Sequence, residues 1–241
     1  MNPTVKRALL AACLSLAVCG AAVVAVDGYH NDEAKDPNHY RWEGTRNGGY
    51  SQLGGIIQSL KGELRTVHEP VTAKALRGID VFLIADPDTP AEAADPKYLS
   101  NTEIDALEKW VSDGGRLVLF GNDKGNAEFD HFNKLAARFG IEFVETIYLD
   151  GGGKSKLNLI SQSSVLGVGL TAYLVDVAPL KITGPKFEAL LTDGSTPIMA
   201  LVHHGKGLVV ALGDPWIYNE YINSKDNHRM AENLFRMLMK R

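Results

Sequence analysis

Cysteine is scarce in this sequence of 241 residues, which has only Cys13 and Cys19, both within the first 20 positions. If that segment is removed on export, the mature chain has no disulfide partner and depends on its hydrophobic core for stability. An excess of basic residues is also missing, since the formal net charge is -4. We therefore expect no nucleic acid partner, because that class of protein needs a basic surface.

Several catalytic motifs are missing as well. No GxSxG or GxCxG nucleophile elbow follows a predicted strand, so a serine or cysteine triad is not expected. The "GGGKS" segment at 151–155 has Tyr148 where a phosphate-binding loop requires its first glycine. His203 and His204 are adjacent on a predicted strand and point to opposite faces, so they cannot share a metal.

The first 20 residues have the layout of a secretory signal. Lys6 and Arg7 precede an apolar stretch that is followed by small residues. We predict a signal peptide at 1–20 and one domain at 21–241, in a protein that is secreted, periplasmic or held at the outer envelope. Two alternatives are a lipid anchor through Cys19, because "LAVC" loosely matches a lipoprotein signal, and a membrane anchor, because the apolar run continues to Val26.

Short apolar runs alternate with helical patterns along the chain. The predicted strands are 21–26, 81–85 and 116–120, and the predicted helices are 51–62, 100–115, 127–140 and a C-terminal segment. Two apolar runs around Gly205-Lys206-Gly207 predict a β-hairpin. This order predicts an α/β fold with a doubly wound, mostly parallel sheet of the flavodoxin-like kind and an antiparallel hairpin near the C-terminus.

Polar side chains follow each predicted strand where that strand ends. They are Asp27 and His30 after the first, Asp86 and Asp88 after the second, Asn122 and Asp123 after the third, and Asp214, Trp216, Tyr218, Asn219 and Glu220 after the strand of the hairpin. Ligands of open parallel sheets bind beyond the carboxyl ends of the strands. We therefore expect these residues to converge on one site, although Asp, Asn and Gly are also ordinary turn formers.

The long loop from His30 to Gly55 adds further candidates, and loops of this length are often functional. Trp42 and Trp216 could stack on sugar faces, and Arg41, with Arg46, could hold a carboxylate through bidentate hydrogen bonds. Asn47, Asn122 and Asn219 could bind hydroxyl groups. This combination suits an acidic oligosaccharide. The alternative is a loop packed on its own aromatic side chains.

The carboxylates could also do chemistry. Asp27, Asp214 and Glu220 are the candidates for an acid and a base acting on a glycosidic bond, and the remaining strand-end and loop residues are candidates for substrate binding. No metal-ligand spacing stands out and no cofactor is expected. A divalent cation held by the strand-end carboxylates and His30 is the alternative.

Some longer segments resemble a known family. "YRWEGTRNGGYSQLGGII", "DPDTP", "WVSDGGRLVLFGNDKGNAEFDHFNKLAARFGI" and "HHGKGLVVALGDPWIYNEY" are similar to the domain at the C-terminal end of some bacterial unsaturated rhamnogalacturonyl hydrolase-like proteins. The resemblance implies a class I glutamine amidotransferase-like fold and a role in secreted breakdown of pectin-like polysaccharides in a bacterium. Those hydrolases do their chemistry on a separate barrel domain, so no catalytic residue is transferred.

Together these observations predict a secreted domain that binds uronic-acid-containing oligosaccharides or assists their degradation. One alternative is a glycoside hydrolase or lyase-like enzyme that uses the strand-end carboxylates on such oligosaccharides. Another is a structural or interaction module of the envelope.

Overall fold

The computed structural model describes residues 20–33, 35–184 and 186–240. The predicted signal peptide, apart from Gly20, lies outside these residues, and so do Cys13 and Cys19. The signal peptide and the lipid anchor therefore stay predictions. Within the described part of the chain, no helix is both long and apolar enough to cross a membrane.

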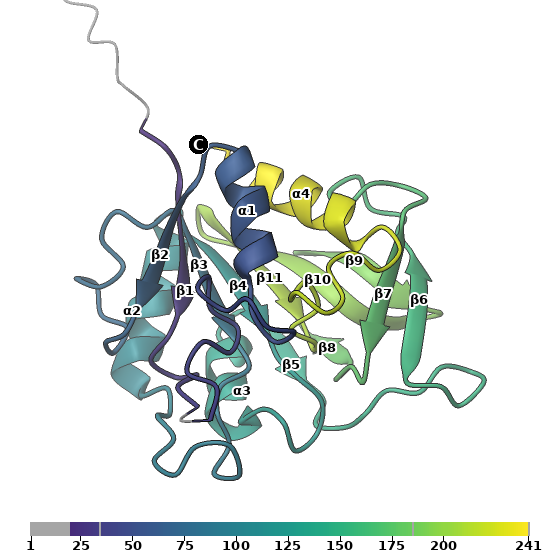
Figure 1. Ribbon diagram of the computed structural model, residues 1–241, viewed down its shortest axis with the longest axis horizontal. Coiled ribbons are helices and arrows are strands. Elements are labelled where there is room, and N and C mark those ends of the chain that lie inside the picture. The colour runs from purple at the N-terminus through teal and green to yellow at the C-terminus, as the bar shows by residue number, and fades with distance from the viewer. Residues whose placement is uncertain (1–19, 34, 185, 241) are drawn as a thin grey trace, which may run out of the picture.

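A sheet of seven strands forms the centre of the fold (Figure 1). Five neighbouring strands are parallel, and the last two extend the sheet as antiparallel strands. In spatial order the strands are β2 (Glu63–Val67), β1 (Val23–Asp27), β3 (Val81–Ala85), β4 (Arg116–Phe120), β11 (Gly207–Leu212), β10 (Thr196–His204) and β9 (Phe187–Asp193). The fold is thus mixed α/β with a mostly parallel central sheet, as the sequence predicted.

The apolar side chains of this sheet form a core on each face. One core packs against α1 (Ser51–Ser59) and α4 (Asn227–Leu238), which lie side by side in Figure 1. The other packs against α2 (Asn101–Ser112) and α3 (Phe129–Ala137). Because β1, β3 and β4 are covered on both sides, they are apolar at almost every position.

Local sequence signals fix the helix boundaries. A capping box forms at the start of α2, since the Ser100 hydroxyl accepts a hydrogen bond from Glu103 N and the Glu103 carboxylate accepts one from Ser100 N. Helices α1, α2 and α3 are each shorter than their predicted ranges by a few residues. Strand β2 was not predicted, because its sequence, ELRTV, alternates exposed and half-buried positions at the edge of the sheet.

Two small antiparallel ribbons lie beside the central sheet, formed by β5 (Ile141–Phe143) with β8 (Leu180–Ile182) and by β6 (Lys156–Ile160) with β7 (Thr171–Val175). The fully buried Asn227 joins β7 to the start of α4. Its Oδ1 accepts from Tyr173 N, and its Nδ2 donates to Tyr173 O and Tyr221 O.

Replacing Asn227 with alanine is expected to lower the free energy of unfolding by about 2–4 kcal/mol, because three buried backbone groups lose their partner. Asn158→Ala, at an exposed position of β6, is the matched control and is expected to change stability by about 0.5 kcal/mol or less. Urea unfolding of both variants tests this expectation. Equal effects would mean that Asn227 does not hold the ribbon.

Candidate functional site

The strand ends singled out in the sequence meet at one edge of the sheet. Strands β1, β3, β4 and β11 are parallel neighbours, so the residues that follow them emerge side by side. The loops are also bonded to one another. Asp88 N donates to His30 O at 2.9 Å, and Asn31 Nδ2 donates to Asp86 O at 2.8 Å. The backbone N–H of Glu220 donates to Asn47 O, and that of Asn219 donates to Gly49 O.

Asp27 and His30 form a buried ion-paired group with Glu103 of α2. His30 Nδ1 lies 2.6 Å from Asp27 Oδ2, and His30 Nε2 lies 3.3 Å from Glu103 Oε1, without the angle of a direct hydrogen bond. Burial alone would lower the pKa of His30, but the two carboxylates raise it to about 10. Burial would raise the pKa of Glu103, but the nearby His30 and hydrogen bonds from Ser100 and Val71 lower it to about 2. The arrangement stabilises the loop after β1.

Arg41 points into the protein, where it cannot grip a ligand. Its Nη2 donates to Gly28 O, Asn31 O and Asp32 Oδ1 at 2.6–2.9 Å, and the residue is buried. The expectation that Arg41 binds a sugar carboxylate is therefore corrected. The guanidinium instead joins three points of the loop after β1, because a buried cation needs acceptors from the surrounding backbone.

The two tryptophans are also inside the protein, so their rings have no face free to stack on a sugar. Trp216 is 0% exposed and lies in the core beneath α1 and α4, and its backbone has the left-handed φ of 53°. Trp42 is 7% exposed, and its Nε1 donates to Arg65 O. The stacking role expected of both is corrected. Their rings are large apolar surfaces that contribute more to stability when buried.

Other residues of segment 213–221, which follows β11, divide between structural and exposed positions. Asn219 Nδ2 donates to Gly44 O and Arg46 O, so this side chain holds the loop after β1 against the loop after β11. Tyr218 is half-buried, with its ring 5.5 Å from that of Tyr40. Glu220 is exposed, as is Asn47.

Asp214 and Asp123 accept hydrogen bonds from the chain around them. Asp214 Oδ2 accepts from Val175 N at 3.0 Å and its Oδ1 contacts Trp216 N, while burial raises the pKa of this carboxyl to about 7. Asp123 Oδ1 accepts from Asn126 Nδ2 at 2.7 Å, and Asn122 Oδ1 accepts from Asp123 N. These bonds hold the turns after β11 and β4.

Asp86 and Asp88 are different, because each has a buried carboxylate oxygen, Oδ1, without a hydrogen-bond partner among the described residues. Burial, followed by the nearby acidic groups, raises the pKa of Asp86 well above its ordinary range. Burial likewise raises the pKa of Asp88 to about 6, and its Oδ2 accepts from Asp32 N at 2.7 Å.

Two residues that the sequence reading did not select, Glu33 and His39, lie beside Asp86. One donor atom from each of the three residues lies within 4.8 Å of the other two. We call Glu33, His39 and Asp86 the carboxylate–histidine cluster. Glu33 and His39 come from an irregular loop, so no helical or strand spacing could reveal that they face the end of β3.

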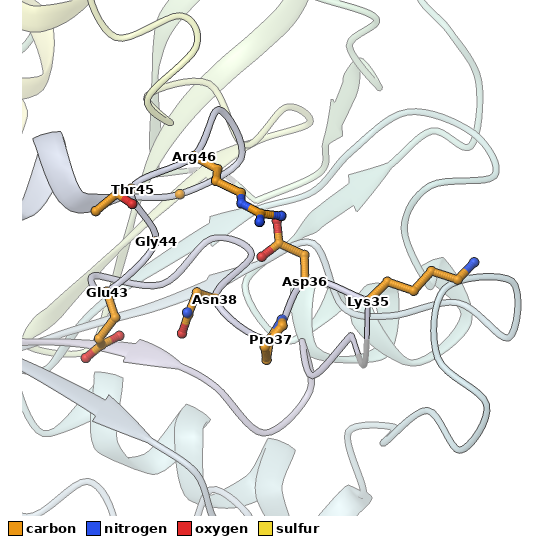
Figure 2. Close-up of a pocket in the computed structure, with 9 residues that line it drawn as sticks. Lys35, Asp36, Pro37, Asn38, Glu43, Gly44, Thr45 and Arg46 are labelled. Carbon is orange, nitrogen blue, oxygen red and sulfur yellow. The ribbon is translucent and has the colours of Figure 1, made fainter.

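The same loop forms a polar pocket (Figure 2). Its volume is about 280 Å³. We call it the loop pocket, and its lining residues are Lys35, Asp36, Pro37, Asn38, Glu43, Gly44, Thr45, Arg46 and Gly49. The loop turns back tightly here, since a Cβ at Gly49 would lie 2.0 Å from Gly44 O. Only glycine allows this approach.

The fold and this edge define a mixed α/β protein with polar loops at the carboxyl ends of a mostly parallel sheet. The chain belongs to the family described as a domain of unknown function, DUF4350, whose model matches residues 86–235. No curated protein matches its sequence.

Solved structures share the fold at low identity. The N-terminal domain of mmIFT52 is 18% identical with a TM-score of 0.71, over 91% of this chain and 98% of that one. The cytoplasmic protein STM1381 from Salmonella typhimurium LT2 is 13% identical with a TM-score of 0.62, over 91% and 100%. A β-galactosidase from Rahnella sp. R3 is 15% identical with a TM-score of 0.55, over 92% of this chain and 32% of that one.

These findings overturn the resemblance inferred from the sequence motifs. The family is DUF4350, and the similar structures include the mmIFT52 domain and STM1381, so the assignment to the glutamine amidotransferase-like domain of rhamnogalacturonyl hydrolase-like proteins was wrong. The quoted motifs consist of strands and helices such as β4, α3 and β11 together with the loops that flank them. Such segments recur in parallel α/β sheets because the fold itself requires them.

The group formed by Asp27, His30 and Glu103 predicts a pH-dependent stability. His30 has a raised pKa, so its contribution is complete below its ordinary pKa of 6.5 and is lost as pH rises toward about 10. Glu103 has a lowered pKa, so its contribution is complete above 4.5 and is lost as pH falls toward about 2. Both contributions are present together between pH 4.5 and 6.5.

The His30→Gln variant separates this contribution from those of other groups. The difference in unfolding free energy between wild type and variant should shrink by up to about 1.4 kcal/mol per pH unit above pH 6.5. Chemical denaturation at a series of pH values measures it. A difference that stays constant from pH 6 to pH 9 would show that His30 is not charged in the folded protein.

Trp216→Ala is expected to destabilise the fold by about 3–5 kcal/mol, because it removes a fully buried aromatic side chain. Phe187→Ala is the control, since Phe187 is 45% exposed at the edge of the sheet, and should cost well under about 1 kcal/mol. Denaturant unfolding measures both values. If Trp216→Ala has the stability of the wild-type protein, Trp216 is not a core residue and is again a candidate for contacting a ligand.

Proposed function

We propose that this domain binds an acidic, uronic-acid-containing oligosaccharide through the loop pocket, without cleaving it. The observation that carries the proposal is the chemistry of the pocket lining. Arg46 offers a cationic group, directed toward Asp36 in Figure 2, and Asn38, Glu43 and Thr45 offer acceptors and donors for hydroxyls. Lys35 adds a second cation at the edge of the pocket, where its side chain extends away from the others. A sugar acid presents these same two needs, a carboxylate to be neutralised and hydroxyls to be hydrogen-bonded.

The size of the pocket supports recognition of a single sugar ring, such as the end of a chain. Its volume of about 280 Å³ lies just below the range of roughly 300–1,000 Å³ for pockets that enclose drug-sized ligands. The flanking loop after β11, with the exposed Glu220, is available to contact the next sugar.

A binding role is favoured over catalysis because two of the three candidate catalytic groups have other partners. Asp27 contacts His30 and the backbone of its own loop, and Asp214 accepts hydrogen bonds from the backbone. The alternative, a glycoside hydrolase or lyase-like enzyme on the same oligosaccharides, is favoured by one observation. Asp88, with its raised pKa of about 6 and its free Oδ1, has the properties of a general acid.

Fold and localisation add context to the proposal. The strand order β2-β1-β3-β4-β11 and the helices on both faces support a doubly wound, flavodoxin-like arrangement. A similar fold occupies about a third of the Rahnella β-galactosidase chain, which agrees with a place beside carbohydrate-active modules. We further propose that the N-terminal signal directs export of the protein as a free domain. The alternative is that the exported protein is held at the envelope by a lipid anchor at Cys19.

Calorimetric titration with oligogalacturonates, and with the same oligosaccharides after reduction of their carboxyl groups, tests the proposal. The acidic form should bind, and the reduced form should bind at least about tenfold more weakly, a loss of about 1.4 kcal/mol. Arg46→Gln should weaken binding of the acidic form to a similar degree. The control is Arg229→Gln, at an exposed position of α4 outside the loop pocket.

Equal affinity for both forms, or no heat with either, would refute recognition of an acidic sugar by the loop pocket. Mass spectrometry of the same mixtures distinguishes binding from turnover. Cleavage products that form with the wild-type protein and do not form with the Asp88→Asn variant would establish the enzymatic alternative.

A further inference from the structure

The carboxylate–histidine cluster brings together three side chains that metal ions prefer. Glu33 and His39 lie on the loop after β1, and Asp86 lies directly after β3, with one donor atom of each within 4.8 Å of the others. In a tetrahedral site two donors on one zinc ion lie about 3.4 Å apart, since each bond is about 2.0–2.2 Å long. To admit an ion, Glu33 and His39, which are in direct contact, would move apart, while Asp86 already lies within 4.8 Å of both.

Asp86 provides a second, independent observation, a buried carboxylate oxygen without a hydrogen-bond partner. The residue is 2% exposed, and its Oδ1 has no hydrogen-bond partner in the described part of the chain. Leaving a buried carboxylate oxygen without a partner is costly, and proteins usually satisfy such an atom with a donor or a metal.

The surrounding charges are predominantly negative. Glu92, Glu33 and Asp88 lie close enough to Asp86 for their negative charges to repel it. The buried Arg41 forms its ion pair with Asp32, and Glu92 accepts its hydrogen bonds from Thr89. A bound dication would balance this excess of carboxylates, which neutral hydrogen-bond donors cannot do.

The loop already holds His39 in place. Its ring stacks on that of Tyr40, with ring centroids 3.9 Å apart and an angle of 25° between the planes. Tyr40 is buried, and its N–H donates to Gly48 O at 2.8 Å. His39 Nδ1 faces Glu33 Oε1 in direct contact. An ion between these two atoms would replace their mutual contact.

We propose that Glu33, His39 and Asp86 bind a divalent transition-metal ion such as Zn²⁺. One imidazole nitrogen with two carboxylates suits zinc, manganese or iron, whereas calcium and magnesium prefer sites made of oxygen alone. Three protein ligands leave a coordination position open for water or a ligand group. The inference does not depend on carbohydrate binding, although the ion would hold Glu33 and His39, between which residues 35–38 line the loop pocket.

The test is calorimetric titration of the full chain with Zn²⁺ and, separately, with Ca²⁺, after treatment with a chelator. A background with Cys13→Ser and Cys19→Ser removes the two thiols that would also bind zinc. One Zn²⁺ per chain is expected with at least tenfold preference over Ca²⁺, and zinc should raise the melting temperature. Replacing zinc by Co²⁺ gives an optical spectrum that reports on the ligands.

His39→Gln and Glu33→Gln should each weaken zinc binding at least tenfold, and both sites are partly exposed, so the fold should survive. Asp86→Asn should do the same while keeping the shape of the buried side chain. His131→Gln is the matched control, because His131 also contacts a glutamate, Glu128, but lies outside the cluster. Zinc binding that is absent, unchanged in His39→Gln and Glu33→Gln, or weaker than calcium binding would overturn the proposal.

Discussion

Burial of a row of carboxylates at the edge of the sheet is the constraint on which the rest of this site depends. Parallel pairing of β1, β3, β4 and β11 places Asp27, Asp86, Asp123 and Asp214 side by side. A buried carboxylate must be protonated, paired or hydrogen-bonded. The protein uses histidine for Asp27, an asparagine side chain for Asp123 and backbone N–H groups for Asp214. Asp86 is left with an oxygen that nothing in the described chain satisfies.

This constraint also explains the form of the long loop after β1. The loop must cover the carboxylates, and a loop without regular structure has many backbone groups to satisfy. Arg41 does this by donating to carbonyls within the same loop, and Asn219 by donating to carbonyls that are distant in the sequence. The residues that looked most like ligand contacts, the long polar and aromatic side chains, are therefore occupied in building the loop. The loop pocket is lined instead by smaller or more peripheral groups such as Asn38 and Arg46.

The sequence was sufficient to predict the central strands and to predict that their carboxyl ends converge. Apolar runs bounded by glycine and aspartate mark buried parallel strands, and parallel pairing then places their ends together. The sequence was insufficient to predict the direction in which individual side chains point. Trp216 follows a strand just as a ligand-stacking residue would, yet its left-handed backbone turns the ring into the core. Likewise, Glu33 and His39 reach Asp86 only through the path of an irregular loop, which no periodicity encodes.

Strand β2 has a consequence for how the molecule behaves in a crowded solution. It is an outer strand of the central sheet, and an open strand edge can pair with the edge of another molecule. Its exposed positions carry Glu63 and Arg65, which alternate with the half-buried Leu64 and Thr66. Charged side chains beside the unpaired backbone groups keep water around them, so a second strand gains little by docking there. The same alternation that concealed β2 from the sequence reading thus protects the sheet against aggregation.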